Sequence, residues 1–259
     1  MGAGFPGILH RATRAETPKL DRYGLNPMSQ AAKAKLSFED PLTYLPRTPL
    51  QEFPKRQIIY DSQQPSDHLY VVIAGRVKVT NQSNDGGEVV ARIVCAEGLF
   101  GEASLIGGAG CTQSAIALDD ATLMSWSPAE IEAQIEREPR LGLALSQYLV
   151  SQCIELQDRI ESMAIYKTPE RVMLALVQLA DALGTPVVDG SIRIASLTHH
   201  TIAEYVGTSR EIVTFQLNRL RRLGLLRYSR KHMDIYTQAI REALRAQGIG
   251  SRHFQTGLK

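Results

Sequence analysis

The sequence predicts an α+β protein in which an N-terminal β-barrel is joined by a long helix to a C-terminal helix-turn-helix. Residues 42–126 contain short segments in which apolar and polar residues alternate, separated by turn-forming residues, a pattern typical of a barrel or sandwich. Residues 139–166 repeat apolar side chains at heptad spacing, which indicates one long helix. Residues 197–220 hold two short helical patterns separated by a glycine, and a chain of 259 residues is long enough for two hydrophobic cores.

Five segments of the N-terminal half show the alternation expected of strands. They are residues 57–60, 68–73, 76–80, 88–94 and 121–126. Turn-forming residues separate them, and the Asn-Asp-Gly-Gly run at 84–87 is a hairpin signal. Many short strands at regular spacing favour one small barrel with a single interior.

Two helices are predicted to follow the barrel. Ser127 can cap the first, which Pro128 opens, and the second is expected over residues 139–166. Apolar residues of the second helix form a heptad seam consisting of Leu149, Cys153, Leu156, Ile160 and Met163. We expect this helix to dimerise, although so short a seam is also compatible with core packing. The Thr-Pro-Glu run at 168–170 then restarts a helix by capping.

Charge is distributed unevenly along the chain. Residues 166–259 contain 14 Lys and Arg against 7 Asp and Glu, whereas residues 41–165 contain 9 against 16. A basic C-terminal third behind an acidic middle is typical of a nucleic-acid-binding module fused to a separate domain.

Several classes of protein are not indicated by the sequence. No apolar run approaches the length of a membrane span, the first ten residues do not have the pattern of a secretory signal, and three scattered cysteines offer no metal-ligand spacing. A phosphate loop, a nucleophile elbow and an HExxH motif are absent. We therefore expect a cytoplasmic protein that is not an enzyme, holds no metal and does not enter a membrane. Residues 1–40 are interpreted as an extension without an assigned role.

The segment 197–220 has the spacing of a helix-turn-helix. Thr198 and Ser209 can cap its two helices, and Gly207 permits the tight turn between them. The second helix presents Arg210 and Glu211 in its first turn, where arginine can bind guanine through two hydrogen bonds and glutamate can accept from cytosine. Double-stranded DNA is thus the predicted partner. A scaffold or regulatory subunit built on the same barrel, without DNA contact, is the alternative.

Further polar and aromatic residues are expected at the DNA surface. Basic side chains of the second helix and the following hairpin can contact phosphates; they are Arg219, Arg221, Arg222, Arg227, Arg230 and Lys231. The full predicted DNA-binding set is Thr198, His199, Thr208, Ser209, Arg210, Glu211, Thr214, Phe215, Arg219 and Lys231.

Over residues 42–236 the chain resembles the cyclic-AMP receptor protein/fumarate-nitrate regulator family of bacterial transcription factors. The resemblance lies in Val-Val-Ile-Ala-Gly-Arg-Val-Lys-Val at 71–79, Gly-Leu-Phe-Gly-Glu at 98–102 and Thr-Ser-Arg-Glu at 208–211. It implies an effector-sensing jelly roll of the cyclic-nucleotide-binding type over residues 41–138, a dimerisation helix over 139–166 and a winged helix-turn-helix over 167–259. It also implies a homodimer that binds a palindromic TGTGA-like site through Arg210 and Glu211, with RNA polymerase as an open further partner. This chain departs from the family pattern at Phe215, which could contact a thymine methyl group, and at Gln216, which is expected to be displaced toward the DNA.

The resemblance also implies an effector pocket in the barrel. Its residues would be Gly101, Glu102, Ala103, Ser104, Gln113, Ser114, Leu156 and Gln157. The resemblance implies that cyclic-AMP binders hold the ribose hydroxyl with this glutamate and the cyclic phosphate with an Arg-Ser or Arg-Thr pair about ten residues later. Gln113-Ser114 stands where that pair would be. A neutral amide lacks the charge-assisted, bidentate contact of an arginine, so cyclic AMP is not the expected effector. Another cyclic nucleotide, a cyclic dinucleotide, or no small molecule at all remain the alternatives.

Overall fold

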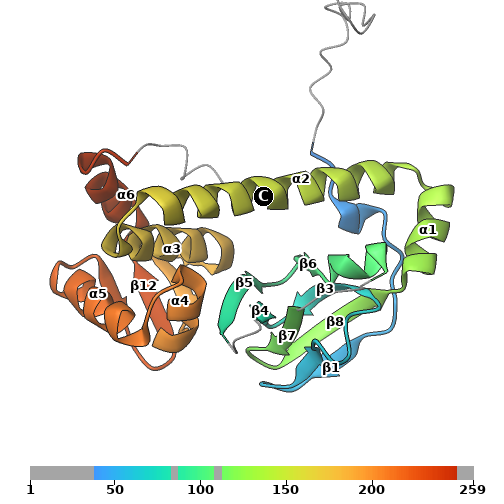
Figure 1. Ribbon diagram of the computed structural model, residues 1–259, viewed down its shortest axis with the longest axis horizontal. Coiled ribbons are helices and arrows are strands. Elements are labelled where there is room, and N and C mark those ends of the chain that lie inside the picture. The colour runs from blue at the N-terminus through green and yellow to red at the C-terminus, as the bar shows by residue number, and fades with distance from the viewer. Residues whose placement is uncertain (1–37, 83–86, 108–112, 250–259) are drawn as a thin grey trace, which may run out of the picture. The chain divides into compact units, whose positions relative to one another are not determined.

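The computed structural model describes residues 38–82, 87–107 and 113–249, and Figure 1 shows its helices and strands. Eight strands come first: β1 (Gln51–Phe53), β2 (Ile58–Tyr60), β3 (Leu69–Ala74), β4 (Val77–Gln82), β5 (Glu88–Val94), β6 (Leu99–Phe100), β7 (Gln113–Ala117) and β8 (Ala121–Trp126). Two 3-10 helices accompany them, η2 (Pro41–Thr43) and η3 (Glu102–Ile106). The remaining elements are α1 (Pro128–Arg137), α2 (Arg140–Ile165), α3 (Thr168–Leu183), β9 (Thr185–Pro186), β10 (Ile192–Ala195), α4 (His199–Val206), α5 (Arg210–Arg222), β11 (Leu226–Tyr228), β12 (His232–Ile235) and α6 (Thr237–Ala246).

The first eight strands form two antiparallel sheets that share one core. One sheet has the order β1-β8-β3-β6 and the other β2-β7-β4-β5. Buried side chains from both sheets, among them Tyr60, Val72, Val79 and Phe100, form a single cluster. The five predicted strands are confirmed to within two residues at their ends, whereas β1, β6 and β7 were missed because they are short or weakly alternating. The predicted hairpin turn joins β4 and β5, but residues 83–86 lie outside the described part of the chain.

The predicted helix starts are confirmed, with one difference in how a helix is capped. Ser127 and Glu130 form a complete capping box at the start of α1. Helix α3 begins at Thr168 as expected, but its N-cap residue is Lys167, whose side chain makes no capping hydrogen bond. The capping argument for α3 was therefore wrong. The helix is stabilised instead by Pro169 in its first turn and by the eight buried residues along its length.

Helix α2 spans 26 residues and is buried only near its N-terminal end. Leu141, Ala144 and Leu145 are buried, with Leu141 and Leu145 packed beside barrel residues such as Leu69. Its C-terminal half exposes apolar side chains instead, as described below. Neither α2 nor any other described helix is long and apolar enough to cross a membrane.

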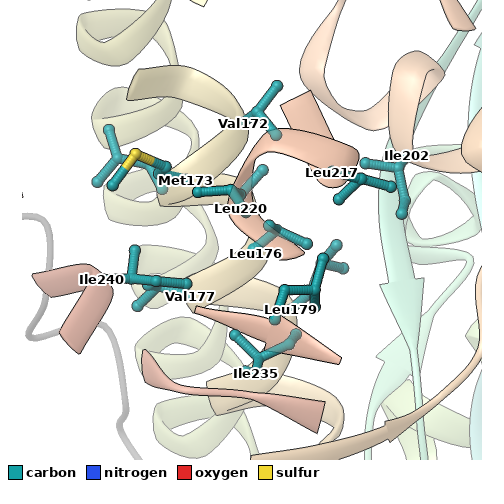
Figure 2. Packing of buried hydrophobic residues seen from close by; sticks show 14 of the residues in the cluster. Val172, Met173, Leu176, Val177, Leu179, Ile202, Leu217, Leu220, Ile235 and Ile240 are labelled. Atoms are coloured by element: carbon teal, nitrogen blue, oxygen red, sulfur yellow. The ribbon is translucent and has the colours of Figure 1, made fainter. Parts of the chain in front are cut away.

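A second core lies in the C-terminal part of the chain. Figure 2 shows apolar side chains from α3, α4, α5, β12 and α6 converging, including Leu176, Ile202, Leu217, Ile235 and Ile240. Strands β10, β11 and β12 form an antiparallel sheet with β9, so the predicted hairpin after α5 is present. Helix α6 was not predicted, although its buried residues Ile240 and Leu244 have helical i, i+4 spacing.

Removing a buried side chain from the second core should destabilise it strongly. Leu217 is fully buried, so Leu217→Ala is expected to lower the free energy of unfolding by about 2–5 kcal/mol through lost burial and the cavity left behind. Leu223→Ala is the matched control because Leu223, at the end of the same helix, is 61% exposed. Urea unfolding followed by circular dichroism measures both, and equal effects would contradict the described packing.

Candidate nucleic-acid interface

Helices α4 and α5 are joined by the tight turn that the sequence predicted. The Thr198 hydroxyl accepts from the main-chain N–H of Thr201 at 3.0 Å and caps α4. Gly207 ends α4 with φ +71°, a left-handed conformation that favours glycine. The Ser209 hydroxyl then caps α5 by accepting from Ile212 N–H at 3.3 Å. This geometry confirms the helix-turn-helix.

Packing of α5 decides which of its side chains face outward. Val213, Leu217 and Leu220 are buried in the C-terminal core. The first turn of α5 is free of that core, so Arg210 and Glu211 are both exposed. Hydrogen bonds from its own main-chain N–H and from the Ser209 hydroxyl lower the pKa of Glu211. An arginine and an ionised glutamate thus lie side by side at an exposed helix N-terminus.

One predicted feature of α5 is wrong. Gln216 was expected to be displaced toward DNA, but only 8% of it is exposed. It lies beside Leu217 and one turn from Val213, on the helix face that packs into the core. Phe215 has the opposite environment, since 60% of it is exposed, and Ile212 is also exposed. The outer face of α5 therefore carries apolar groups that could meet thymine methyl groups.

His199 and Thr214 join the two helices by a hydrogen bond. The Nδ1 atom of His199, in the first turn of α4, lies 2.8 Å from the hydroxyl of Thr214 on α5. The same hydroxyl donates to the carbonyl of Arg210 at 2.8 Å. Burial, together with the nearby charge of Arg210, lowers the pKa of His199, which favours its neutral form. These two residues fix the spacing between α4 and the exposed turn of α5.

The predicted phosphate-contacting residues fall into two groups. Arg219, Arg221, Arg222, Arg230 and Lys231 are exposed, on the last turn of α5 and in the turn between β11 and β12, and Arg221 also lies over the Tyr228 ring. Arg227 is exposed as well, but it pairs with Asp189 of the loop before β10 and lies over the Tyr236 ring. Two hydrogen bonds from Ser191, together with Tyr236 and Arg227, lower the pKa of Asp189 to about 2, so the pair is charged at neutral pH. Arg227 therefore has an intramolecular role that its position in the sequence did not reveal.

The residues of the predicted effector pocket are placed on three different elements. Gly101 has φ +83°, and a Cβ there would lie 2.5 Å from the His68 carbonyl, which explains the need for glycine. Glu102, Ala103 and Ser104 form η3. Gln113 and Ser114 lie on β7 opposite β4, and Leu156 and Gln157 are on α2. Ser114 is buried, while Leu156 and Gln157 are exposed.

The carboxylate of Glu102 forms an ion pair with an arginine that was not predicted to be part of the pocket. Arg92 of β5 forms an ion pair with Glu102, and only 23% and 20% of their side chains are exposed. The carboxylate of Glu102 is thus engaged by another side chain of this protein, and Gln113 and Ser114 of the predicted pocket are neutral. The predicted pocket residues therefore do not supply the cation that a cyclic phosphate would need. The sequence feature that could have revealed this ion pair is Arg92 itself, because it is the one charged residue within the apolar segment 89–94.

The predicted dimer seam forms a continuous exposed stripe on α2. Leu149, Leu156, Ile160 and Met163 are between 41% and 67% exposed, and Cys153 is exposed as well. Val150 and Ile154 extend the stripe. In the described part of the chain these side chains do not belong to any of the core clusters.

Comparison with known proteins matches two family models to separate parts of the chain. Residues 50–138 match the cyclic nucleotide-binding domain, and residues 170–246 match the Crp-like helix-turn-helix domain. The chain is 28% identical over 185 residues to a CRP-like cAMP-activated global transcriptional regulator of Mycobacterium tuberculosis, a match covering 71% of this chain and 82% of the relative. It is 27% identical over 190 residues to the global nitrogen regulator of Synechocystis, a match covering 72% and 84%.

A solved structure shows the same architecture. A CRP/FNR-family transcriptional regulator from Thermus thermophilus superposes with a TM-score of 0.62 at 25% identity, covering 76% of this chain and 98% of the other. Barrel, long helix and helix-turn-helix therefore occur in the same order in both. The chain belongs to the CRP/FNR family of transcription regulators, with a cyclic nucleotide-binding domain followed by a Crp-like helix-turn-helix domain.

Proposed function

We propose that the chain acts as a homodimer that binds a palindromic, TGTGA-like DNA site, with Arg210 and Glu211 of each protomer contacting base edges. The exposed first turn of α5 carries this proposal, because Arg210 and Glu211 project from a helix that is otherwise anchored in the C-terminal core. A guanidinium can bind guanine through two hydrogen bonds, and an ionised glutamate can accept from cytosine, so the pair suits a G·C step.

Affinity for the DNA backbone would come from the exposed basic residues around α5. Arg219 and Arg222 close the helix, and Arg230 and Lys231 project from the β11–β12 turn, the position of a wing. Such contacts supply sequence-independent affinity and orient the reading helix. His199 and Thr214 would position Arg210 through their hydrogen bonds. RNA polymerase is the further partner that we propose, because a DNA-bound regulator would change transcription by contacting it.

The proposed dimer rests on the exposed stripe of α2. A row of apolar side chains at steps of four and three residues matches the seam of a two-helix coiled coil. Pairing two copies of α2 would relate the two recognition helices by a two-fold axis, and a palindromic site mirrors that symmetry. We assign residues 41–138 to the sensor, 139–166 to the dimerisation helix and 167–259 to the DNA-binding domain.

Reversing the charge of Arg210 should remove sequence-specific binding. In fluorescence anisotropy at fixed physiological salt, Arg210→Glu is expected to lower affinity for a palindromic TGTGA-type duplex by at least roughly 5- to 150-fold, the range for losing one bidentate contact. Arg137→Glu is the matched control, since it makes the same charge change at an exposed site on α1. A scaffold that does not contact DNA would show no preference for the palindrome over a scrambled duplex, with or without the substitution.

Placing a carboxylate in the α2 stripe should dissociate the dimer. Ile160 is 67% exposed in the protomer and would be buried by a second α2, so Ile160→Glu would force an unpaired charge into an apolar interface. Sedimentation velocity at several concentrations should show dimeric wild type and a monomeric variant. Val188→Glu, at a fully exposed apolar residue of the β9–β10 loop, should remain dimeric. A wild-type protein that is monomeric at micromolar concentration would contradict the proposed homodimer.

A further inference from the structure

Arg92 connects the barrel to α2 through several acceptors at once. Its Nη2 donates to Glu102 of η3, and its Nη1 donates to the Tyr148 hydroxyl at 3.1 Å and to Gln152 Oε1 at 2.5 Å. Tyr148 and Gln152 are four residues apart on α2, so they lie on one face of that helix. One side chain of β5 thus holds η3 and two turns of α2 together.

Tyr148 extends the connection to a third part of the barrel. While it accepts from Arg92, its hydroxyl donates to the carbonyl of Leu99 on β6 at 2.7 Å. Burial raises the pKa of Tyr148 to about 12, which keeps the hydroxyl protonated and able to donate. Burial also opposes the charge of Arg92, but Tyr148 and Glu102 outweigh that effect and raise the pKa of its guanidinium, which stays charged and able to donate.

A second arginine carries the connection from β5 to the helix-turn-helix. Arg159 lies two turns beyond Gln152 on α2 and donates to the carbonyls of Ala91 at 2.8 Å and Val90 at 2.7 Å. The same guanidinium donates to the carbonyl of Tyr205 in the last turn of α4 at 2.5 Å, and it lies 4.7 Å from the centre of the Tyr205 ring. Residues 90–92 of β5 are therefore linked to α2 by two arginines, Arg92 of the strand and Arg159 of the helix. Arg159 also links them to α4.

A further ion pair joins the strand next to β5 with α4. Lys78 of β4 lies 3.1 Å from Glu88 of β5 and 3.3 Å from Glu204 of α4. Glu204 and Lys78 are only 8% and 12% exposed, so their attraction is weakly screened by solvent. In this arrangement Arg210 and Glu211 remain exposed, and the contacts do not cover the base-facing turn.

We propose that Arg92 takes the place of a small-molecule effector, bridging the barrel and α2 permanently so that this chain binds DNA without a cyclic nucleotide. The proposal rests on the proposed DNA-binding function and specifies how that function is regulated. Arg92 occupies the carboxylate of Glu102 and contacts α2, so the link between sensor and helix is made by the chain's own side chains. A nucleotide entering this pocket would have to break a largely buried ion pair first.

The test compares specific DNA binding by wild type and Arg92→Met in the absence of nucleotide. A duplex selected from a random library by the wild-type protein removes uncertainty about the half-site, and a scrambled duplex reports non-specific binding. Arg92→Met keeps an unbranched apolar stem but loses the guanidinium and all its hydrogen bonds, so specific affinity should fall by roughly 5- to 150-fold, the usual range for coupling between two sites. Non-specific affinity should not change, because Arg92 donates its hydrogen bonds to η3 and α2 and is not one of the exposed basic residues around α5. Adding cyclic AMP, cyclic GMP or cyclic di-GMP should leave the wild-type affinity unchanged.

Control variants separate this role from general destabilisation. Arg140→Met makes the same substitution and also breaks an arginine–glutamate pair on α2, but its partner Glu39 lies outside β5 and η3. It should bind DNA like wild type. Tyr148→Phe removes only the hydroxyl between Arg92 and Leu99, so it tests the same connection if Arg92→Met does not fold. It should weaken specific binding in the same direction, with urea unfolding used to verify that it is folded.

Two results would overturn this inference but leave the proposed DNA-binding function intact. One is a folded Arg92→Met or Tyr148→Phe variant that binds the selected duplex as tightly as wild type. The other is a wild-type protein that binds the selected duplex only after a cyclic nucleotide is added. A protein that shows no sequence preference in any variant, with or without nucleotide, would instead contradict the proposed DNA-binding function, and the inference with it.

Discussion

The joint between β5 and α2 is the constraint on which the rest of the structure depends. Arg92 extends from β5 to Glu102 and to α2, and Arg159 extends from α2 back to the carbonyls of Val90 and Ala91. A guanidinium presents five donors in a rigid fork, so each arginine fixes several acceptors relative to one another. Breaking either group of contacts would leave buried polar groups unpaired, which is unfavourable. Strand and helix therefore behave as one unit.

The same joint links the interior of the barrel to the surface that would face DNA. Arg159 holds the carbonyl of Tyr205, and Gly207, two residues later, ends α4 and forms the turn into α5. Ser209 then caps the helix that carries Arg210. A shift of β5 relative to α2 would thus be transmitted over a few residues to the base-facing turn. These residues form a contiguous set of contacts from β5 through α2 to the end of α4.

Periodicity predicted the helix-turn-helix well but placed some side chains wrongly. Caps and the turn glycine follow local rules, so Thr198, Gly207 and Ser209 could be assigned from the sequence. The burial of Gln216 could not be predicted in this way, because it depends on how much of α5 is covered by the rest of the C-terminal core. Arg227 was missed as an ion-pair partner for the same kind of reason, since Asp189 is 38 residues away in the chain.

The sequence by itself determined five strands of the barrel, the long helix and the helix-turn-helix, and it showed the uneven distribution of charge. The five strands and the helices follow from spacing within a short window, where hydrophobic periodicity and capping act. Only the tertiary structure decided that Arg92 occupies Glu102, that Arg159 joins β5 to α4, and that α6 completes the second core. The contacts of Arg159 join residues up to 69 positions apart, and a guanidinium finds its acceptors by position in space rather than by spacing along the chain.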